Sequence, residues 1–398
     1  MALGKEAGEK DARLRRAVGA PAGEGDPRPM GRFEHGGDVW AHPGCTDFSA
    51  NVNPLGMPAA AREALVRSVD SYAAYPDPDC AALRRAIAAF EGVDAAWVLP
   101  TAGASDLMAR VCRALRPARA LVTAPCYSGY EQALEQVGAS VVRHALLERD
   151  GFRLTERVLD DVCGCDLVFL ASPNNPTSLG VDLGLLGRVV ARAAEVGATV
   201  VLDECFCDFC ERPSGVALAG AWPNLVVMKA LTKTFALAGL RVGYGVCSDA
   251  GLLAGLAAQG EPWAVSTPAQ VAGVAALSEP GFVERTRAYV AAGRARLVAG
   301  MRALGLGVVE GEANFLLVRS DRELFSPLLA RGFLVRRCEN FHGLAGGCGE
   351  GGTRLAGGCG EAGAAAPGDG GGPWWYRVAV RTHEENEALL GALAEVLG

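Results

Sequence analysis

Short, uninterrupted apolar runs that alternate with longer helical segments are the feature of this sequence that most restricts its fold. The runs are RALVTAP (119–125), DLVFLASP (166–173), TVVLDE (199–204), NLVVMKAL (224–231) and VGYGVCS (242–248). Segment 183–198, LGLLGRVVARAAEVGA, carries apolar residues at helical spacing between two of them. Strands that are apolar along their whole length are typical of a parallel sheet covered by helices on both faces. We therefore expect an α/β fold with a mostly parallel central sheet.

The pattern changes near Gly281. From there, long helical stretches surround the strand-like runs NFLLVR (314–319), FLVRR (333–337) and WYRVAVR (375–381). We expect residues 281–398 to form a smaller C-terminal α+β domain, after a large domain over residues 59–280. Residues 32–58 are expected to form an N-terminal arm.

Two segments lack the composition of a packed core. Residues 1–31 are charged throughout, and residues 345–373 are rich in glycine; the motif LAGGCGE occurs at Leu344 and again at Leu355. Burial of so few apolar groups cannot offset the entropy lost on ordering. We expect a disordered extension over 1–31 and a flexible surface insertion over 345–373. Metal binding by the repeated Cys348 and Cys359 is the weaker alternative.

The composition also excludes several classes of partner. The net charge is -7 and no basic run is interleaved with aromatic residues, so no nucleic-acid partner is expected. No apolar stretch reaches the ~20 residues that span a bilayer, and no apolar h-region follows the start. We expect a cytoplasmic protein whose 13 cysteines stay reduced. The segment CFCDFC (205–210) is expected to continue a strand, with Cys205 and Cys207 on one face and Cys210 on the other, so no metal site is predicted.

The segment KALTKTFALAGLRVGYGV (229–246) places Lys233 in mostly apolar surroundings, eight residues before Arg241. Such surroundings lower the pKa of an amine, which can then form a Schiff base with an aldehyde. Pyridoxal phosphate (PLP) is an aldehyde cofactor with further requirements. It needs a carboxylate at its pyridine nitrogen, a donor at its ring oxygen, an aromatic ring against its face, and amides, hydroxyls and a cation at its phosphate.

Each requirement has a candidate residue, and the order of these candidates along the chain is compatible with a single cofactor site. Three candidates end apolar runs, as expected for a site at the carboxyl ends of parallel strands. The candidates are Gly103, Ala104, Ser105, Thr232 and Arg241 for the phosphate, Tyr127 for the ring face, Asn175 for the ring oxygen, Asp203 for the nitrogen and Lys233 for the aldehyde. We also expect a cis bond before Pro176. Singly, Asp203 could be a helix cap, Asn175 part of a turn and Tyr127 a packing residue; their agreement in order favours a cofactor site.

With these motifs, the sequence resembles the fold-type I PLP enzymes of the aminotransferase class I/II group, over about residues 32–344 and 374–398. Two branches are similar to it, the histidinol-phosphate aminotransferases and the threonine-phosphate decarboxylases. The segments HGGDVW (35–40) and DFSANVNPLGMP (47–58) look like the decarboxylase branch. In addition, Phe206 stands where the aminotransferase branch usually has a tyrosine.

The resemblance implies further site residues. Arg377 would bind the substrate carboxylate with Asn314 near it, and Ser49 and Asn51 would lie in the arm that lines the site. His35 and Arg381 would lie near the substrate phosphate or at the domain interface. Tyr75, at the start of YPDPDCAALRRAIA (75–88), would reach the PLP phosphate of the partner subunit, which implies a homodimer.

Several positions depart from the family pattern. Thr101-Ala102-Gly103 replaces the usual Gly-Asn-Gly, Ala230 replaces a hydroxyl residue, and Lys229 stands where an arginine is usual. Ala238 stands where the decarboxylase branch often has proline. These departures predict a lower affinity for PLP.

The function that the resemblance implies is decarboxylation of L-threonine O-3-phosphate to (R)-1-aminopropan-2-yl phosphate for the cobalamin side chain. Lys233, Asp203 and Tyr127 would be its catalytic residues. Three alternatives stay open: an aminotransferase acting on a phosphorylated amine such as histidinol phosphate, a serine-phosphate decarboxylase, and a PLP-fold ligand sensor. A single methyl group is worth only ~1–3 kcal/mol of discrimination. The sequence leaves open which Cα bond lies perpendicular to the ring, and hence whether CO2 or a proton leaves.

Overall fold

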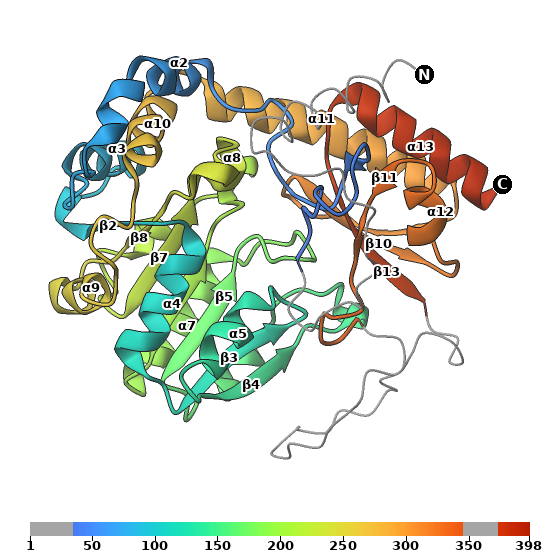
Figure 1. Cartoon of the computed structure of the whole chain (residues 1–398). Coiled ribbons are helices and arrows are strands. Elements are labelled where there is room, and N and C mark those ends of the chain that lie inside the picture. The colour runs from blue at the N-terminus through green and yellow to red at the C-terminus, as the bar shows by residue number, and fades with distance from the viewer. Residues whose placement is uncertain (1–34, 345–372) are drawn as a thin grey trace.

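A seven-stranded sheet forms the centre of the computed structural model, which describes residues 35–344 and 373–398 (Figure 1). In spatial order, its strands are β2 (Val98–Thr101), β8 (Gly243–Val246), β7 (Leu225–Ala230), β6 (Thr199–Asp203), β5 (Leu167–Ala171), β3 (Arg119–Ala124) and β4 (Ser140–Ala145). Strand β8 is antiparallel to both of its neighbours, and the other pairs are parallel. The expected mostly parallel sheet is confirmed.

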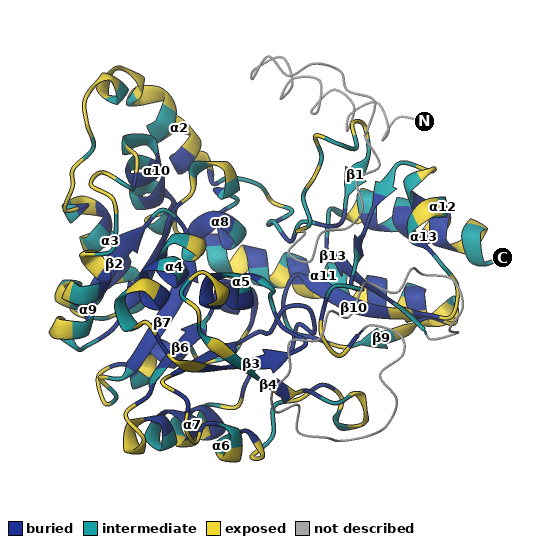
Figure 2. Cartoon of the chain, turned by 60° about the horizontal axis from the view of Figure 1, so that its bottom comes forward, coloured by how far each residue is buried: buried dark blue, intermediate teal, exposed yellow. Residues whose placement is uncertain are grey.

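The central strands are buried on both faces because consecutive side chains enter different cores. Val200 packs into the core on one face and Val201 into the core on the other. On the first face Leu185 and Val189 of a helix cover the sheet, and on the second Leu107 covers it. This two-sided burial explains why these strands lack the alternation of polar and apolar residues. Figure 2 shows the result, with dark blue strands inside and yellow confined to outward-facing surfaces.

Nine α-helices of the described chain lie before the smaller C-terminal unit. They are α2 (Ala59–Arg67), α3 (Ala81–Glu91), α4 (Ala104–Leu115), α5 (Gly129–Glu135), α6 (Val158–Asp161), α7 (Leu183–Glu195), α8 (Leu231–Thr234), α9 (Ala250–Ala257) and α10 (Thr267–Leu277). Helix α7 corresponds to the helical pattern predicted over 183–198. It begins at Leu183 because the side chain of Asp182 accepts a hydrogen bond from the Leu185 amide at 2.9 Å.

A second, antiparallel sheet lies beyond α11 (Phe282–Ala303), the long helix between the two units in Figure 1. Its strands, in spatial order, are β12 (Arg336–Arg337), β13 (Trp374–Ala379), β10 (Phe315–Ser320) and β9 (Gly307–Val309). Helices α12 (Phe325–Leu329) and α13 (His383–Leu397) complete this unit. Thr382 and Glu385 form a capping box that starts α13.

The arm crosses from the large unit to the small one. Its strand β1 (Thr46–Asp47) pairs in parallel with β11 (Phe333–Leu334), and Phe48 is buried in the core of the second unit. Residues 35–51 are thereby held between the two units. The predicted extension 1–31 and insertion 345–373, with Cys348 and Cys359, lie outside the described residues except for Pro373.

One expectation about the cysteines was wrong. Strand β6 ends at Asp203, and residues Cys207–Phe209 form a 3-10 turn, so the cysteines do not alternate along a strand. The turn forms because the Glu204 carbonyl accepts a hydrogen bond from the Cys207 amide and the chain bends away from the sheet. Among the described residues, no cluster of histidine, cysteine or acidic side chains is suited to hold a metal ion. Within the same residues, each helix is too short or too polar to cross a bilayer.

Gly243 of β8 lies against the first turn of α4. A Cβ atom there would lie 2.9 Å from Ala104 N, from Gly103 C and from Lys229 O, three backbone atoms that cannot move independently. We predict that Gly243→Ala lowers the free energy of unfolding by about 1–3 kcal/mol, the usual cost of overpacking. Gly255→Ala in α9 is the matched control, because an added Cβ meets no atom within 4 Å there. Urea denaturation followed by circular dichroism tests both; equal effects of the two substitutions would contradict the prediction.

Candidate active site

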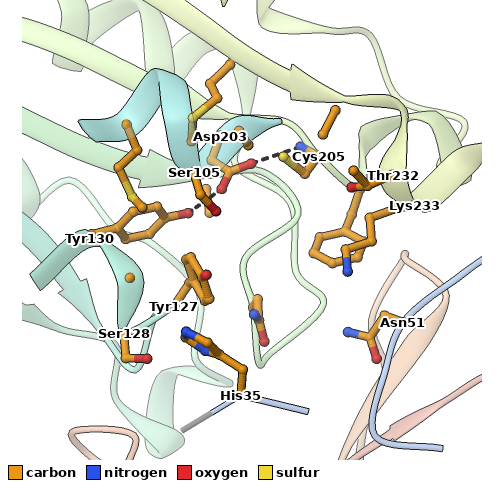
Figure 3. A pocket seen from close by; sticks show the side chains of 18 of the residues that line it. His35, Asn51, Ser105, Tyr127, Ser128, Tyr130, Asp203, Cys205, Thr232 and Lys233 are labelled. Atoms are coloured by element: carbon orange, nitrogen blue, oxygen red, sulfur yellow. Dashed lines mark hydrogen bonds between the residues drawn. The ribbon is translucent and has the colours of Figure 1, made fainter. Parts of the chain in front are cut away.

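A cavity of about 500 Å³ opens at the carboxyl ends of the central strands (Figure 3). Its walls come from the arm, the large sheet and the second unit. The predicted residues that line it are His35, Asn51, Ala104, Ser105, Tyr127, Asn175, Asp203, Thr232, Lys233, Arg241 and Arg377. Segments far apart in the sequence therefore meet around one space.

Lys233 lies in α8, immediately after β7, and its amine points into the cavity. Burial, followed by the positive charges of Arg377 and Arg241, lowers the pKa of this amine to about 8. The arm holds the backbone of α8, since the Asn53 amide donates to the Lys233 carbonyl at 3.1 Å. A lysine with this pKa is partly neutral near pH 8 and able to act as a nucleophile.

Asp203 ends β6 and presents its carboxylate to the same space. Its Oδ1 accepts the Cys205 amide at 2.9 Å, and its Oδ2 accepts the Tyr130 hydroxyl at 2.6 Å. Burial and the neighbouring Asp203 raise the pKa of Tyr130 well above its ordinary value, so the hydroxyl keeps the proton that it donates. These contacts fix the carboxylate in one orientation, as a partner for a cationic ring nitrogen requires.

Tyr130 was not predicted from the sequence as a site residue. Its signal was present in APCYSGY, where Tyr130 follows Tyr127 by three residues at the start of α5. That spacing places two aromatic rings close together, and they meet edge to face with centroids 5.5 Å apart. Tyr130 also stacks on Phe169 of β5 with centroids 5.1 Å apart.

The ring of Tyr127 forms one wall of the cavity. A Cβ atom at Gly129 would lie 2.3 Å from this ring, so only glycine allows the ring to occupy its position. His35 lies on the arm with its ring centroid 5.3 Å from that of Tyr127. The phenol thus presents an aromatic face to the cavity, near Ser105 and across the space from Lys233 in Figure 3.

The first turn of α4 and Arg241 form a cationic end of the cavity. Gly103 has φ +90°, and a Cβ added there would lie 3.0 Å from Arg241 Nη2, so the guanidinium closely approaches the loop. The Ala102 amide is held inside the loop by Asp106 Oδ2 at 2.9 Å. A 12-residue helix that begins here adds the positive end of its dipole. With the buried Thr232 hydroxyl, these groups suit a phosphate.

Two buried arginines of the small antiparallel sheet also line the cavity. Arg377 donates from Nη1 to Asn175 Oδ1 at 2.7 Å and from Nη2 to the Ser49 carbonyl at 2.5 Å. Burial, followed by the charge of Arg336, lowers the pKa of Arg377 to about 10. Arg336 lies in β12. The run FLVRR was predicted only as a strand, so Arg336 was not predicted as a site residue.

Other predicted residues differ in their placement, and Asn314, Arg381 and Tyr75 are not among the residues that line the cavity. Asn314 and Asn51 are buried with amide atoms that have no hydrogen-bond partner in the described chain. Arg381 is not brought to the cavity, because its guanidinium pairs with Glu385 at the start of α13. Tyr75 is 80% exposed and stacks on Trp263 with centroids 4.5 Å apart, away from the cavity of its own chain.

The groups around the cavity fit PLP. A lysine, a fixed carboxylate, an aromatic face and a cationic helix start surround one space and match the aldehyde, pyridine nitrogen, ring and phosphate. Gly129 and Gly103 leave room where larger residues would contact Tyr127 or Arg241. The peptide bond between Asn175 and Pro176 is cis, as expected from the sequence. The buried amide of Asn175 lies in the cavity beside Arg377.

Comparison with known proteins gives concordant matches. Residues 43–358 match the model of the family described as aminotransferase class I and II. The chain is 35% identical over 357 residues to a threonine-phosphate decarboxylase of Salmonella typhimurium, covering 88% of this chain and 91% of the relative. It is 32% identical over 362 residues to a histidinol-phosphate aminotransferase of Ralstonia nicotianae, covering 88% of each. The crystal structure of a histidinol-phosphate aminotransferase from Clostridium acetobutylicum matches with a TM-score of 0.77 and 25% identity, over 88% of this chain and 98% of that one.

The lowered pKa of Lys233 predicts its chemical reactivity. Because the neutral amine reacts, labelling of Lys233 by trinitrobenzenesulfonate should rise with a midpoint near pH 8, below the ordinary lysine value of about 10.4. Lys229, whose pKa is raised well above that value, should stay unlabelled and serves as the internal control. Peptide mass spectrometry after timed labelling measures both, and a Lys233 midpoint near 10 would contradict the prediction.

Proposed function

The chain belongs to the aminotransferase class I and II family, and from this premise we propose that it decarboxylates L-threonine O-3-phosphate with PLP as its cofactor. The product would be (R)-1-aminopropan-2-yl phosphate, a precursor of the cobalamin side chain. The observation that carries this proposal is the pair of buried arginines, Arg336 and Arg377, at one end of the cavity.

The substrate carries two anionic groups on a small skeleton. A carboxylate on Cα and a phosphate ester on the adjacent Cβ suit two neighbouring guanidinium groups, of which the charge of Arg336, after burial, lowers the pKa of Arg377. Arg377 would bind the carboxylate, and Arg336 would bind the phosphate. His35 lies close enough to both arginines for their charges to lower its pKa, after the effect of burial, and it would assist at the phosphate. Ser49, Asn51 and Asn314 would complete the substrate contacts, and Asn314 has both amide atoms without a partner in the described residues.

The remaining residues would bind and orient the cofactor. When bound, PLP supplies an electron-withdrawing ring that accepts the electron pair of a Cα bond of the substrate. Lys233 would hold the aldehyde carbon and afterwards exchange a proton with Cα, as its pKa of about 8 allows. Asp203, fixed by Tyr130 and Cys205, would keep a proton on the ring nitrogen. Tyr127 would stack on the ring.

Two further contacts would orient the reaction. Asn175 would donate to the ring oxygen, and its Oδ1 already accepts from Arg377, so the cofactor and the carboxylate site share one amide. Only the substrate Cα bond that lies perpendicular to the plane of the cofactor ring would be weakened. Arg336 and Arg377, acting together on both ends of the substrate, would place the Cα–carboxylate bond in that direction, and CO2 would leave.

A homodimer is part of the proposal. Tyr75 and Trp263 form an exposed aromatic stack, and Val66 and Val69 are also exposed nearby in the chain. A second copy would cover this surface, and Tyr75 would reach the PLP phosphate of that copy. We also propose the domain boundaries 32–58, 59–280 and 281–398, because α11 begins at Phe282.

An aminotransferase acting on histidinol phosphate is the second candidate. The 32% identity to a histidinol-phosphate aminotransferase favours it, as does the TM-score of 0.77 with another. Phe206 argues against it, since this residue lines the cavity without a hydroxyl group where the aminotransferase branch usually has one.

The first prediction concerns the reaction itself. Protein incubated with PLP and L-threonine O-3-phosphate, without any keto acid, should release CO2 and aminopropanol phosphate for many turnovers. Lys233→Ala should abolish this release, because the amine holds the cofactor and moves the proton. The absence of release, together with turnover of histidinol phosphate only when 2-oxoglutarate is added, would show that the chain is an aminotransferase.

The second prediction concerns Arg336. Loss of a charge-assisted contact to phosphate costs about 1.5–3 kcal/mol, so Arg336→Met should raise KM at least tenfold. The control is Arg337→Met on the same strand, whose guanidinium lies 4.6 Å from the Phe325 ring centroid and does not line the cavity. Steady-state kinetics with matched thermal melts compare the two variants. Equal changes in KM in the two variants would show that Arg336 does not contact the substrate.

A further inference from the structure

Lys229, four residues before Lys233 in the chain, is the centre of a buried ionic cluster. Its Nζ is 2.7 Å from Glu91 Oε1 and 2.9 Å from Asp208 Oδ1, and all three side chains are largely buried. They come from β7, from the last residue of α3 and from the 3-10 turn after β6. None of the three lines the cavity, and no catalytic role described above uses them.

We propose that this cluster positions Lys233, acting through the hydroxyl of Thr234. This inference rests on the proposed role of Lys233 in binding the cofactor. Thr234 follows Lys233 directly and is fully buried. Its Oγ1 donates to Asp208 Oδ2 at 3.2 Å, while the other oxygen of the same carboxylate accepts from Lys229. The ammonium of Lys229 therefore fixes the acceptor that holds the residue next to the reactive lysine.

Helix α8 needs such an external support because it contains only four residues, Leu231–Thr234. A single turn has too few internal hydrogen bonds to be stable alone. Asn53 holds the turn from the arm side, by Nδ2 to the Thr234 carbonyl at 2.6 Å. Asp208 holds it through the Thr234 hydroxyl at 3.2 Å, and the Asp208 carbonyl accepts Arg287 Nε at 2.9 Å. Residues from two other parts of the chain thus fix α8.

The cluster is charged despite its burial. Burial alone would lower the pKa of Lys229, but Asp208, Tyr244 and Glu91 raise it well above its ordinary value. The Tyr244 hydroxyl also donates to Glu91. A buried ionic cluster often stabilises a fold less than apolar packing of equal volume would. The cluster therefore matters for α8 because its hydrogen bonds to Asp208 are directional, and not because it increases the stability of the fold.

Thr234→Val tests this link most directly. Valine has nearly the shape of threonine but cannot donate to Asp208, and the substitution leaves Lys229 paired and both backbone contacts of Asn53 unchanged. We expect kcat to fall about tenfold or more with KM unchanged, because small displacements of a reacting group are costly. Thr234→Ser keeps the hydroxyl and should restore kcat to within about threefold.

Two measurements separate positioning from mere structural support. In the protein without added PLP, the labelling midpoint of Lys233 should move upward in Thr234→Val, toward the ordinary lysine value, because a displaced amine becomes better hydrated. The rate of PLP uptake, followed by the absorbance band near ~420 nm, should fall in the same variant. Thr234→Ser should match the parent in both, at equal melting temperatures.

Lys229→Met and Lys229→Arg provide the second pair, in case the valine variant does not fold. Arginine keeps the cation beside Asp208 and should retain the parent labelling profile, whereas methionine removes it and should reproduce the effects of Thr234→Val. Parent-like kcat and labelling in Thr234→Val would overturn the inference, as would a loss that serine does not restore. If the parent protein itself fails to bind PLP, the proposed function fails instead, so the two failures are distinguishable.

Discussion

The buried guanidinium of Arg377 is the contact on which the assembly of the site depends. It comes from the small antiparallel sheet, donates to Asn175 of the large unit and donates to the carbonyl of Ser49 in the arm. One side chain therefore joins the three parts of the chain that surround the cavity. Burial and the charge of Arg336 lower its pKa to about 10, so the protein holds this cation under electrostatic strain that an anion would relieve. An anion bound at Arg377 would therefore act on all three parts of the chain at once.

Positive charge reaches the cavity from two parts of the chain. Arg241 and the start of α4 line it from the large unit, and Arg336 and Arg377 line it from the small one, while Asp203 and Lys233 line the same space. Burial, together with the positive charges of Arg377 and Arg241, keeps the Lys233 amine partly neutral. The arginines suited to attract anions therefore also contribute to the low pKa of the amine.

Much of this arrangement could be predicted from the sequence, because its signals are local. The apolar runs predicted the mostly parallel sheet, and the ends of three of them supplied Asn175, Asp203 and Lys233, which the structure brings to one cavity. Tyr130 and Arg336 escaped prediction because their importance arises from contacts between segments distant in sequence, such as the bond from Tyr130 to Asp203 over 73 residues. Arg381 lies four residues after Arg377 and beyond the end of β13, where a local pair with Glu385 holds it. The predicted continuation of β6 past Asp203 was wrong because the Glu204 carbonyl accepts the Cys207 amide, which turns the chain away from the sheet after Glu204.

The bond between Arg377 and Ser49 also has a consequence for how the protein is made. It spans 328 residues, and β1 of the arm pairs with β11, nearly as far along the chain. During synthesis the arm leaves the ribosome first, yet the partners that hold it emerge last. The large sheet can fold while translation continues, but the part of the cavity around Arg377 cannot form until β13 has been synthesised. Any product of premature termination would therefore carry the lysine and the central sheet without a finished recognition site, and the arm would leave its apolar Phe48 exposed to chaperones and proteases.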